Sequence, residues 1–452
     1  MSSFRSRARH ALADPDLQQA LRGASGGFTH GRERAWNELP DAQGLRRRAA
    51  WARRRAVATL PEQWERFTEA AEEAGAEMFW ATTAGEAVDL VVGLATEVGA
   101  RLVVKSKSML SEEIHLNEAL EGAGMEVVET DLGELIVQWA HEPPSHIIAP
   151  AVHKTRQQVR ALFAGRTGTD PGPEIPALTE LARRHLRGEF LRADVGISGA
   201  NLAIAETGSV VLVTNEGNAR MVATLPRMHI AVVGAEKVVA DLDDAAVVLE
   251  MLARSATGQR STSYLQWVTG PRRPGEMDGP ERLCIVVVDA GRSRVAGTGY
   301  QDVLACIRCG SCLNVCPVYT TTGGHAYHSP YQGPIGAVIT PLLRGGPGDW
   351  ELAHASTLCG ACLEACPVMI DLPQMLLDLR ADAPRSPLAR AAGRSGALLA
   401  APRDFHRTFR GLRRLQGPVV LGGRLRWSPF PLGRWLRGRT LPPLASRFFR
   451  ER

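Results

Sequence analysis

Residues 306–317 have the sequence CIRCGSCLNVCP, and this stretch decides what the C-terminal part of the chain can be. Its four cysteines follow the spacing C-x2-C-x2-C-x3-C and are followed directly by a proline. Three thiolates spaced in this way can surround one cuboidal iron–sulfur cluster, and Gly310 allows the tight turn that this requires. The fourth thiolate points away and serves a second cluster. We therefore expect a two-cluster region.

A second motif, CGACLEACP at residues 359–367, supplies three more cysteines. Aligned backward from its Cys–Pro pair, it matches the first motif, except that Ser356 stands where the first cysteine would be. In such pairs the last cysteine of each motif serves the other cluster. Cluster one then has four ligands, Cys306, Cys309, Cys312 and Cys366. Cluster two has three, Cys316, Cys359 and Cys362. The corner without a thiolate makes cluster two labile or a three-iron form.

Zinc and disulfides are the alternative uses of these cysteines. A zinc site takes four ligands, so seven cysteines would leave a remainder, and the Cys–Pro ending is typical of ferredoxins. The N-terminus has no apolar signal region, and no run approaches the ~20 apolar residues of a membrane span. We expect a cytoplasmic protein, in which clustered cysteines bind metal rather than form disulfides. The eighth, Cys284, lies in an apolar stretch and is expected in the core.

Length and charge limit the organisation of the chain. With 452 residues, it should form two structured units plus tails. A net charge of +5 is too small for this length to indicate a nucleic-acid partner. Most of the positive excess lies after Arg403, in a tail with interleaved tryptophan and phenylalanine. We interpret this tail as solvated, with peripheral membrane contact as the alternative, because five prolines prevent one long amphipathic helix there.

Residues 62–295 alternate helical segments with short apolar strands, which predicts an α/β domain with a largely parallel sheet. The predicted strands are RLVVKSK, GMEVVETD, SHIIAPA, LAIAETGSVVLVTN, MHIAVVGAEKVV and RLCIVVVDA. The stretch around ETGSVVLVTN is expected to form a hairpin on that sheet. Around this domain we predict a basic, solvated helical segment at 1–61, a ferredoxin-like domain at 296–384 and an Arg/Pro-rich tail at 385–452.

Polar side chains follow several predicted strands. Lys105 and Lys107 fall on one side of an extended segment, where two cations could meet a carboxylate or phosphate. Glu112 and Glu113 follow Ser111 at an expected helix start, which favours a capping role. Further polar residues end a strand or surround the hairpin: Glu129, Asp131, Asn201, Glu206, Thr207, Asn215, Glu216 and Asn218. These residues fit a ligand pocket and a docking face for a partner equally well. His146 and His153 are expected to be structural.

Four longer stretches carry a family resemblance. They are VVKSKSMLSEEIHLNEALE (103–121), VVETDLGELIVQWAHEPPSHIIAPAVHK (127–154), GISGANLAIAETGSVVLVTNEGNARM (196–221) and CPVYTTTGGHAYHSPYQGPIGAVITPLL (316–343). Together they resemble the lactate utilization protein B family, the iron–sulfur subunit of a three-part L-lactate oxidation system. The resemblance covers about residues 61–379. It implies an α/β LUD domain, similar to the sugar-phosphate isomerase and CoA-transferase fold, followed by a mainly helical ferredoxin-type domain with two 4Fe–4S clusters.

The resemblance further implies action with two partner subunits in converting L-lactate to pyruvate. We expect a non-catalytic electron-transfer subunit, because no flavin or nicotinamide fingerprint is evident. Two alternatives stay open. The chain could be an oxidoreductase in its own right, binding an organic acid and using the open corner of cluster two. It could also be a regulatory protein that senses iron through a labile cluster.

Overall fold

The computed structural model describes residues 3–383, 396, 400, 402–416, 420–421, 424–425 and 442–445. The chain divides into two compact units, Met1–Ala381 and Asp382–Arg452. The first unit holds the α/β region and both cysteine motifs. The finer boundaries, at residues 61, 295 and 384, stay predictions.

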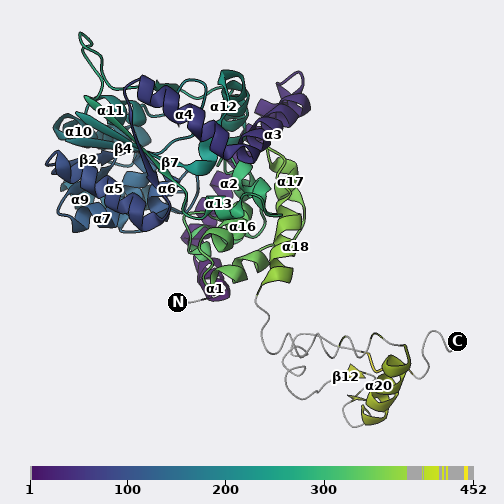
Figure 1. Cartoon of the computed structure of the whole chain (residues 1–452). Coiled ribbons are helices and arrows are strands. Elements are labelled where there is room, and N and C mark those ends of the chain that lie inside the picture. Colours follow the sequence, from purple (N-terminus) through teal and green to yellow (C-terminus); the bar gives the residue numbers. More distant parts are fainter. Residues whose placement is uncertain are drawn as a thin grey trace. The chain divides into compact units, whose positions relative to one another are not determined.

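A six-stranded sheet forms the centre of the first unit (Figure 1). All its neighbouring strands run parallel, as predicted for an α/β domain. In spatial order the strands are β1 (Glu77–Ala81), β10 (Arg282–Val288), β7 (Met228–Gly234), β4 (Val195–Ser198), β2 (Leu102–Lys105) and β3 (Glu126–Glu129). Both faces of the sheet are covered, which explains why strands such as β10 are continuous apolar runs. Within β10, Cys284 is fully buried on the face covered by α5 (Ala84–Glu97), as expected of a core residue.

Helices cover both faces of this sheet. On one face lie α5, α6 (Met109–Glu113) and α7 (Leu116–Gly122), whose apolar side chains share a core with β1, β2, β4, β7 and β10. On the other face α4 (Leu60–Glu73) packs near β7 and β10. The part of that face near β2 and β3 is covered by α8 (Leu132–Ala140), α9 (Arg156–Thr167) and α10 (Ile175–Arg192).

A second, four-stranded sheet lies against the α4 side of the first. Its order is β8 (Val238–Val239), β5 (Leu202–Ile204), β6 (Ser209–Thr214) and β9 (Tyr264–Val268). Strands β5 and β6 form the predicted antiparallel hairpin. The hairpin belongs to this separate sheet, however, and is not part of the parallel one. The sequence did not indicate this because β1, β4 and β9 were not predicted, and β9 supplies the partner that pairs with β6.

The segment SHIIAPA at residues 145–151 is a loop, and the prediction of a strand there was wrong. His146 Nδ1 accepts the backbone N–H groups of Ile148 and Ala149 at 3.0 and 3.2 Å, so a side chain replaces sheet partners. The loop packs on the first cysteine motif instead. His146 Nε2 lies 3.1 Å from Asn314 Oδ1, and a Cβ on Gly310 would lie 3.1 Å from the imidazole. His146 is therefore structural, as expected.

The N-terminal segment is helical, as predicted, but it is not solvated throughout. It forms α1 (Phe4–Ala13), α2 (Pro15–Asn37) and α3 (Ala42–Ala58), and α3 packs on α12 (Leu242–Ala256). Arg53 of α3 is buried, with a side-chain exposure of 1%. Its guanidinium donates to four backbone carbonyls, those of Glu236, Val238, Leu304 and Ala305. Part of the arginine-rich stretch therefore joins the α/β domain to the region before the first cysteine.

The cysteine region is mainly helical, with short elements between turns. Four further elements precede the first motif: α11 (Asn218–Thr224), just before β7, then η1 (Ala235–Lys237), α13 (Arg292–Val295) and η2 (Gln301–Ala305). The region itself contains α14 (Ser311–Asn314), α15 (Tyr319–Thr322), η3 (His325–Tyr327), α16 (Gly333–Leu343), η4 (Asp349–His354), α17 (Ala361–Ala365) and α18 (Leu372–Asp382). Helix α2 packs against α14 and α15, so the N-terminus helps to enclose the first motif.

The described part of the second unit contains α20 (Pro402–Leu415), β11 (Val420–Leu421) and β12 (Arg424–Leu425). The tail residues that prompted the membrane alternative, Trp427, Trp435, Phe448 and Phe449, lie outside the described residues, as do Pro418, Pro429 and Pro431. Among the residues that are described, no helix has both the length and the apolar composition to cross a bilayer.

Candidate redox centre and the adjoining cavity

The two cysteine motifs repeat one backbone geometry. Arg308 and Leu358, each two residues after the first position of its motif, both have a positive φ, of 59° and 57°. Gly310 and Gly360 follow with φ of 73° and 87°, and each caps the start of a short helix, α14 or α17. Glycine is favoured there because its missing Cβ removes the steric cost of this conformation.

Ser356 takes the local position of a first cysteine. The backbone N–H of Leu358 donates to Ser356 Oγ at 3.1 Å. In the first motif the backbone N–H of Arg308 donates to Cys306 Sγ at 3.4 Å. The same turn therefore presents an oxygen in one motif and a sulfur in the other.

The seven motif cysteines have neighbours from both motifs. Burial first, and then the nearby thiols of Cys306, Cys309 and Cys366, raise the pKa of Cys312 well above its ordinary value. For Cys362, burial and then Cys316 and Cys359 raise the pKa to about 12. Cys366 thus lies with the first motif, and Cys316 with the second. All seven are free thiols in the structure.

This donor set fits iron–sulfur clusters. Thiolate sulfur is the ligand that such clusters use, and amide hydrogen bonds to sulfur help to set their potentials. Several amides point at the sulfurs here, including Ile370 N–H to Cys366 Sγ at 3.3 Å. Cys309, Cys312, Cys316, Cys362 and Cys366 are buried, whereas Cys359 is exposed. The second group of thiols therefore reaches the surface of the first unit.

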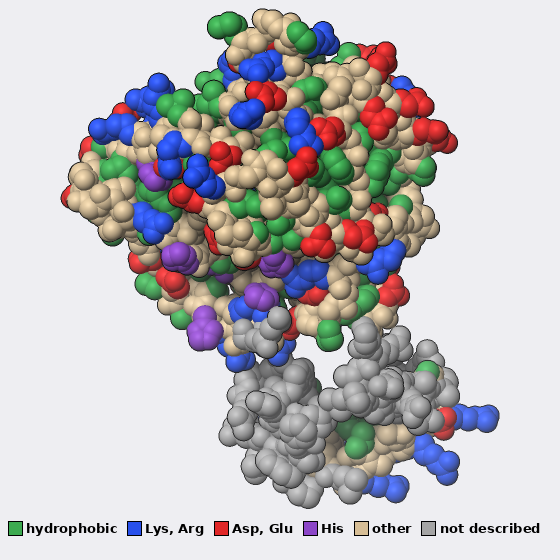
Figure 2. All heavy atoms as spheres, turned by 60° about the vertical axis from the view of Figure 1, so that its left-hand side comes forward, with side chains coloured by type: hydrophobic (Ala, Val, Ile, Leu, Met, Phe, Trp, Pro, Cys, Tyr) green, Lys and Arg blue, Asp and Glu red, His purple; other side chains and the backbone are tan. Residues whose placement is uncertain are grey.

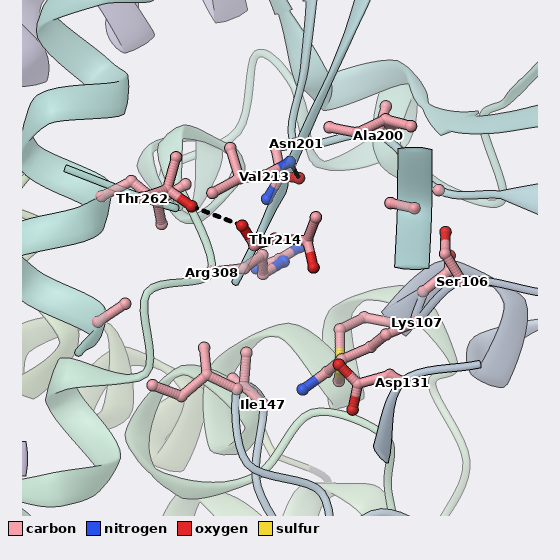
Figure 3. A pocket seen from close by; sticks show the side chains of 18 of the residues that line it. Ser106, Lys107, Asp131, Ile147, Ala200, Asn201, Val213, Thr214, Thr262 and Arg308 are labelled. Carbon is pink, nitrogen blue, oxygen red and sulfur yellow. Dashed lines mark hydrogen bonds between the residues drawn. The ribbon is translucent and has the colours of Figure 1, made fainter. Parts of the chain in front are cut away.

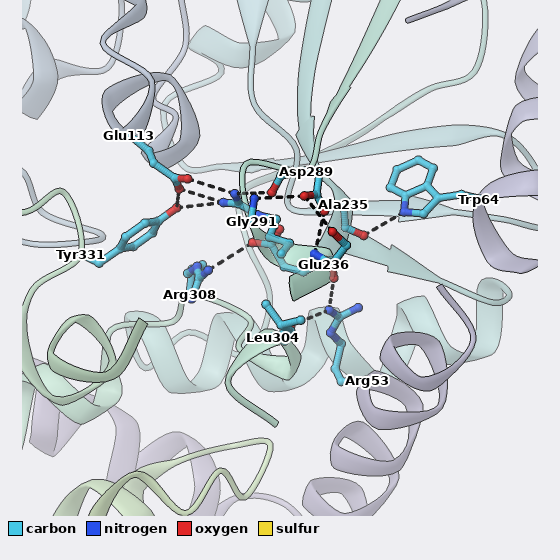
Figure 4. A network of polar contacts seen from close by, with 12 residues as sticks. Arg53, Trp64, Glu113, Ala235, Glu236, Asp289, Gly291, Leu304, Arg308 and Tyr331 are labelled. Atoms are coloured by element: carbon cyan, nitrogen blue, oxygen red, sulfur yellow. Dashed lines mark hydrogen bonds and ion pairs between the residues drawn. The ribbon is translucent and has the colours of Figure 1, made fainter. Parts of the chain in front are cut away.

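A buried ionic network joins the first motif to the α/β domain (Figure 4). Glu236, in η1 directly after β7, pairs with Arg292 Nε at 2.5 Å and with Arg308 Nη2 at 3.1 Å. Arg292 in turn holds Glu113 at 2.8 Å, and Tyr331 OH donates to the same carboxylate at 2.6 Å. Burial by itself raises the pKa of Glu236, but the guanidinium groups of Arg292 and Arg308 hold this pKa well below its ordinary value. The carboxylate is therefore ionised and fixes Arg308 in place.

Arg308 also lines a cavity of about 280 Å³ at the carboxyl ends of the central strands (Figure 3). The loops after β2, β3 and β4, the end of β6 and the segment after β7 form most of its wall. Figure 3 shows Arg308 on one side and Lys107, with Asp131 beside it, on another. The carboxyl ends of parallel strands are the usual place for ligands in α/β folds. A cavity therefore lies at these strand ends, where a pocket was predicted.

Two cationic side chains that line this cavity each have a nitrogen donor without an acceptor among the described residues. Lys107 Nζ and Arg308 Nη1 are buried and have no hydrogen-bond partner among the described residues. Burial lowers the pKa of Lys107, against the attraction of Asp131. Glu216 also lines the cavity, and burial together with Asp131 raises its pKa to about 7. The cavity thus contains two unsatisfied donors on basic side chains and a carboxyl that changes charge near neutral pH.

Lys105 does not share this cavity, so the prediction that Lys105 and Lys107 meet one anion was wrong. Lys105 is buried, and its Nζ lies 2.6 Å from Glu129 Oε1 and 3.3 Å from Glu112 Oε1. Although burial lowers it, these carboxylates raise the pKa of Lys105. Its charge is therefore neutralised within the domain. Lys105 ends β2, whereas Lys107 follows in the loop, where strand alternation no longer applies.

The other predicted polar residues divide between the cavity and local roles. Asp131 and four residues near the hairpin line the cavity: Asn201, Asn215, Glu216 and Asn218. Glu206 instead accepts the N–H of Leu242, and Thr207 donates to Ser209. The predicted helix start at Ser111 was also misplaced, because α6 begins at Met109 with Ser108 as its cap. Glu113 consequently serves the buried network rather than a cap.

His153 has neighbours that the sequence did not indicate. His153, Glu142 and His325 place one potential ligand atom each within 4.8 Å of one another. Lys154 already forms an ion pair with Glu142, however, so a cation occupies that carboxylate. Glu142 and His325 border a larger opening of about 1160 Å³, which His115, His141 and His328 also line. Figure 2 shows histidines gathered on one face of the molecule.

Sequence reasoning missed Arg308, Glu236, Tyr331 and Arg53. Only Arg308 carried a signal, since a cation between two cluster cysteines in CIRC could have been noted. The other three take part through contacts between residues far apart in the sequence.

Comparison with known proteins gives this geometry a family. The model of the LUD domain matches residues 64–288, and that of the 4Fe-4S dicluster domain matches residues 302–370. Lactate utilization protein B of Shouchella clausii is 43% identical over 454 residues, which cover 99% of this chain and 96% of that protein. The chain belongs to the lactate utilization protein B family. It therefore has an α/β LUD domain followed by a ferredoxin-type region, and the matched dicluster domain is an iron–sulfur domain.

Two further relatives support this family membership. Lactate utilization protein B of Bacillus licheniformis is 44% identical and covers 98% of this chain and 95% of its own length. The Uncharacterized electron transport protein YkgF of Escherichia coli K12 is 40% identical. The match covers 100% of this chain and 96% of that protein. A DUF162 family protein from Deinococcus radiodurans aligns with 51% of this chain and 98% of its own, at 18% identity and a TM-score of 0.29. That structural likeness is too weak to carry an argument.

Proposed function

We propose that this chain is the iron–sulfur electron-transfer subunit of a system that oxidises L-lactate to pyruvate with two partner subunits. The names of its relatives supply lactate and electron transport. One observation carries the proposal: each motif contributes thiols to both groups, because Cys366 lies near the first motif and Cys316 near the second. This exchange is the arrangement of two-cluster ferredoxins.

We assign cluster one to Cys306, Cys309, Cys312 and Cys366, and cluster two to Cys316, Cys359 and Cys362. When bound, such clusters accept and release single electrons. The exposed Cys359 supports cluster two as the point of exchange with a partner. The absence of a nicotinamide or flavin fingerprint in the sequence supports placing the hydride-accepting cofactor on another subunit.

The cavity bears on the alternative in which the chain acts alone through the open corner of cluster two. Its wall includes Arg308 of the first motif, but none of the described residues 356–367. Among the described residues, this cavity therefore adjoins the first motif and does not reach Ser356. This favours the electron-transfer role over open-corner catalysis.

Lactate-dependent cluster reduction tests the proposal. The chain, purified anaerobically, should show reduced-cluster EPR signals with L-lactate only when the partner subunits are present. Cys359→Ser should interrupt electron delivery to the partner-dependent acceptor. Cys284→Ser, which changes a core thiol in β10, should not. Lactate turnover by the lone, flavin-free chain would refute the proposed role.

A further inference from the structure

The cavity beside the first cysteine motif contains buried donors on basic side chains that lack acceptors among the described residues. Arg308 is only 8% exposed. Its Nη2 donates to Glu236, whereas its Nη1 has no acceptor among the described residues. Lys107 Nζ, on another side of the same cavity, is buried and likewise has no acceptor in the described part of the chain. A buried donor left unpaired is costly, and a buried cation more so. Two such groups facing one cavity point to an anion that accepts from both.

The charges of the lining favour a monoanion. Three cationic residues line the cavity, Lys107, Lys237 and Arg308, and three acidic ones do, Asp131, Glu216 and Glu236. With all six ionised the lining is neutral. Protonation of Glu216, whose pKa is about 7, brings it to about one positive charge. A single negative charge balances this lining, whereas a dianion such as phosphate would leave excess charge in a buried place.

The remaining walls favour an organic molecule. Ile147, Leu212 and Val213 supply apolar surface, while Ser106, Asn201 and Thr214 supply polar groups. A volume of about 280 Å³ admits a ligand of a few carbon atoms with its hydrogen-bonding groups. A short carboxylic acid with a hydroxyl or oxo group matches these features together.

We propose that this cavity binds a small monoanionic 2-hydroxy or 2-oxo carboxylate between Lys107 and Arg308, and that Arg308 couples its binding to the cluster held by the first motif. The position of Arg308 couples ligand binding to the cluster. Arg308 lies between Cys306 and Cys309, and its backbone N–H donates to Cys306 Sγ. A negative charge bound at Arg308 repels the negative charge that an added electron brings to the cluster. The ligand therefore binds more tightly to the oxidised protein, and by reciprocity it makes the cluster harder to reduce. The coupling rests on the proposed cluster assignment; the binding site does not.

Calorimetry on the cluster-loaded full chain, with oxidised clusters, tests the binding. L-lactate, pyruvate, acetate, inorganic phosphate and chloride serve as the probes. Lactate or pyruvate should bind in a saturable manner, and more tightly than the other three. Lys107→Met should weaken this binding about tenfold or more, while Lys107→Arg should largely retain it. Arg187→Met, on the exposed surface of α10 and outside the cavity lining, removes one positive charge as the control and should change nothing.

Redox titration followed by EPR tests the coupling. Saturating ligand should shift the midpoint potential of cluster one to more negative values and that of cluster two by less, and Lys107→Met should abolish the shift. Iron content and melting temperature equal to wild type would show that the variant is folded. Preferred binding of phosphate, or binding that Lys107→Met leaves unchanged, would overturn the site. Failure of electron transfer to partner subunits would instead refute the proposed function, since calorimetry needs no partner.

Discussion

Arg308 Nη2 lies 3.1 Å from Glu236 Oε1, and this contact joins the loop of the first cysteine motif to η1, directly after β7. Both side chains are buried, and the Arg308 guanidinium lies 4.6 Å from the centre of the Tyr331 ring. The fold thereby holds the first motif and the wall of the adjoining cavity in one fixed arrangement.

Removing the charge of Glu236 should strongly destabilise the first unit. Glu236→Gln leaves Arg292 and Arg308 buried without their shared carboxylate, and breaking a buried pair in this way costs about 3–5 kcal/mol. Anaerobic chemical denaturation measures the change. Glu281→Gln is the control, because Glu281 pairs with Arg227 at the exposed surface, where little loss is expected. Equal stability of the two variants would contradict the structural role of the network.

Iron analysis should give about seven to eight irons per chain in anaerobic preparations, with matching acid-labile sulfide. Seven free thiols in two groups are the ligand type that two iron–sulfur clusters use. Chelation of the iron should lower the melting temperature, because ligands that bind only the folded chain stabilise it. Stoichiometric zinc without sulfide would end the iron–sulfur interpretation.

Cluster two should lose one iron on mild oxidation, and Ser356→Cys should prevent it. A serine hydroxyl gives up its proton far less readily than a thiol, so it is a poor ligand at neutral pH. Ser356 Oγ occupies the local position that Cys306 Sγ has in the first motif, so a cysteine there should complete the ligand set. Air-oxidised wild type should show the EPR signal of a three-iron cluster, and the variant should lack it.

His354→Cys provides the matched control for this change. It adds a thiol two residues before Ser356, on an exposed side chain, without filling the position equivalent to Cys306. The three-iron signal should persist in this variant. If Ser356→Cys also keeps the signal, the alignment that puts Ser356 at the open corner is wrong.

Carboxylate binding in the cavity should weaken as the pH rises through about 7. Burial and Asp131 raise the pKa of Glu216 to about 7, so the residue is neutral below this pH and repels an anion above it. Lys237, whose pKa burial lowers to about 8, loses its positive charge next. Glu216→Gln should remove the first step and leave the second. Calorimetry between pH 6 and 9 would show this, and an unchanged profile in the variant would assign the titration elsewhere.

The same carboxyl affects stability with a definite sign. Its pKa in the folded chain lies above the ordinary 4.5, so between these values the folded state holds a proton that the unfolded state has lost. Glu216 therefore favours folding at low pH, and this contribution is lost as the pH rises from about 4.5 through 7. Glu216→Gln should flatten the fall in unfolding free energy over that window.

The sequence determined the features that depend on local spacing. The intervals between cysteines, the glycine after the second ligand position and the final proline identify both motifs, and the structure repeats one turn in each. Short apolar strands that alternate with helical segments likewise predicted the parallel sheet, because strands buried on both faces must be apolar throughout. Such patterns are written within a few residues and need no distant partner.

Only the tertiary structure decided the composition of the cavity. Lys105 and Lys107 are alike in sequence. Glu129 nonetheless neutralises Lys105, whereas Lys107 faces the cavity with no acceptor among the residues that the structure describes. Arg308 and Glu236 lie 72 residues apart in the sequence, and no local sequence pattern predicts their contact. Which charges are satisfied depends on which segments the fold brings together, and burial then fixes the energetic cost of any left unpaired.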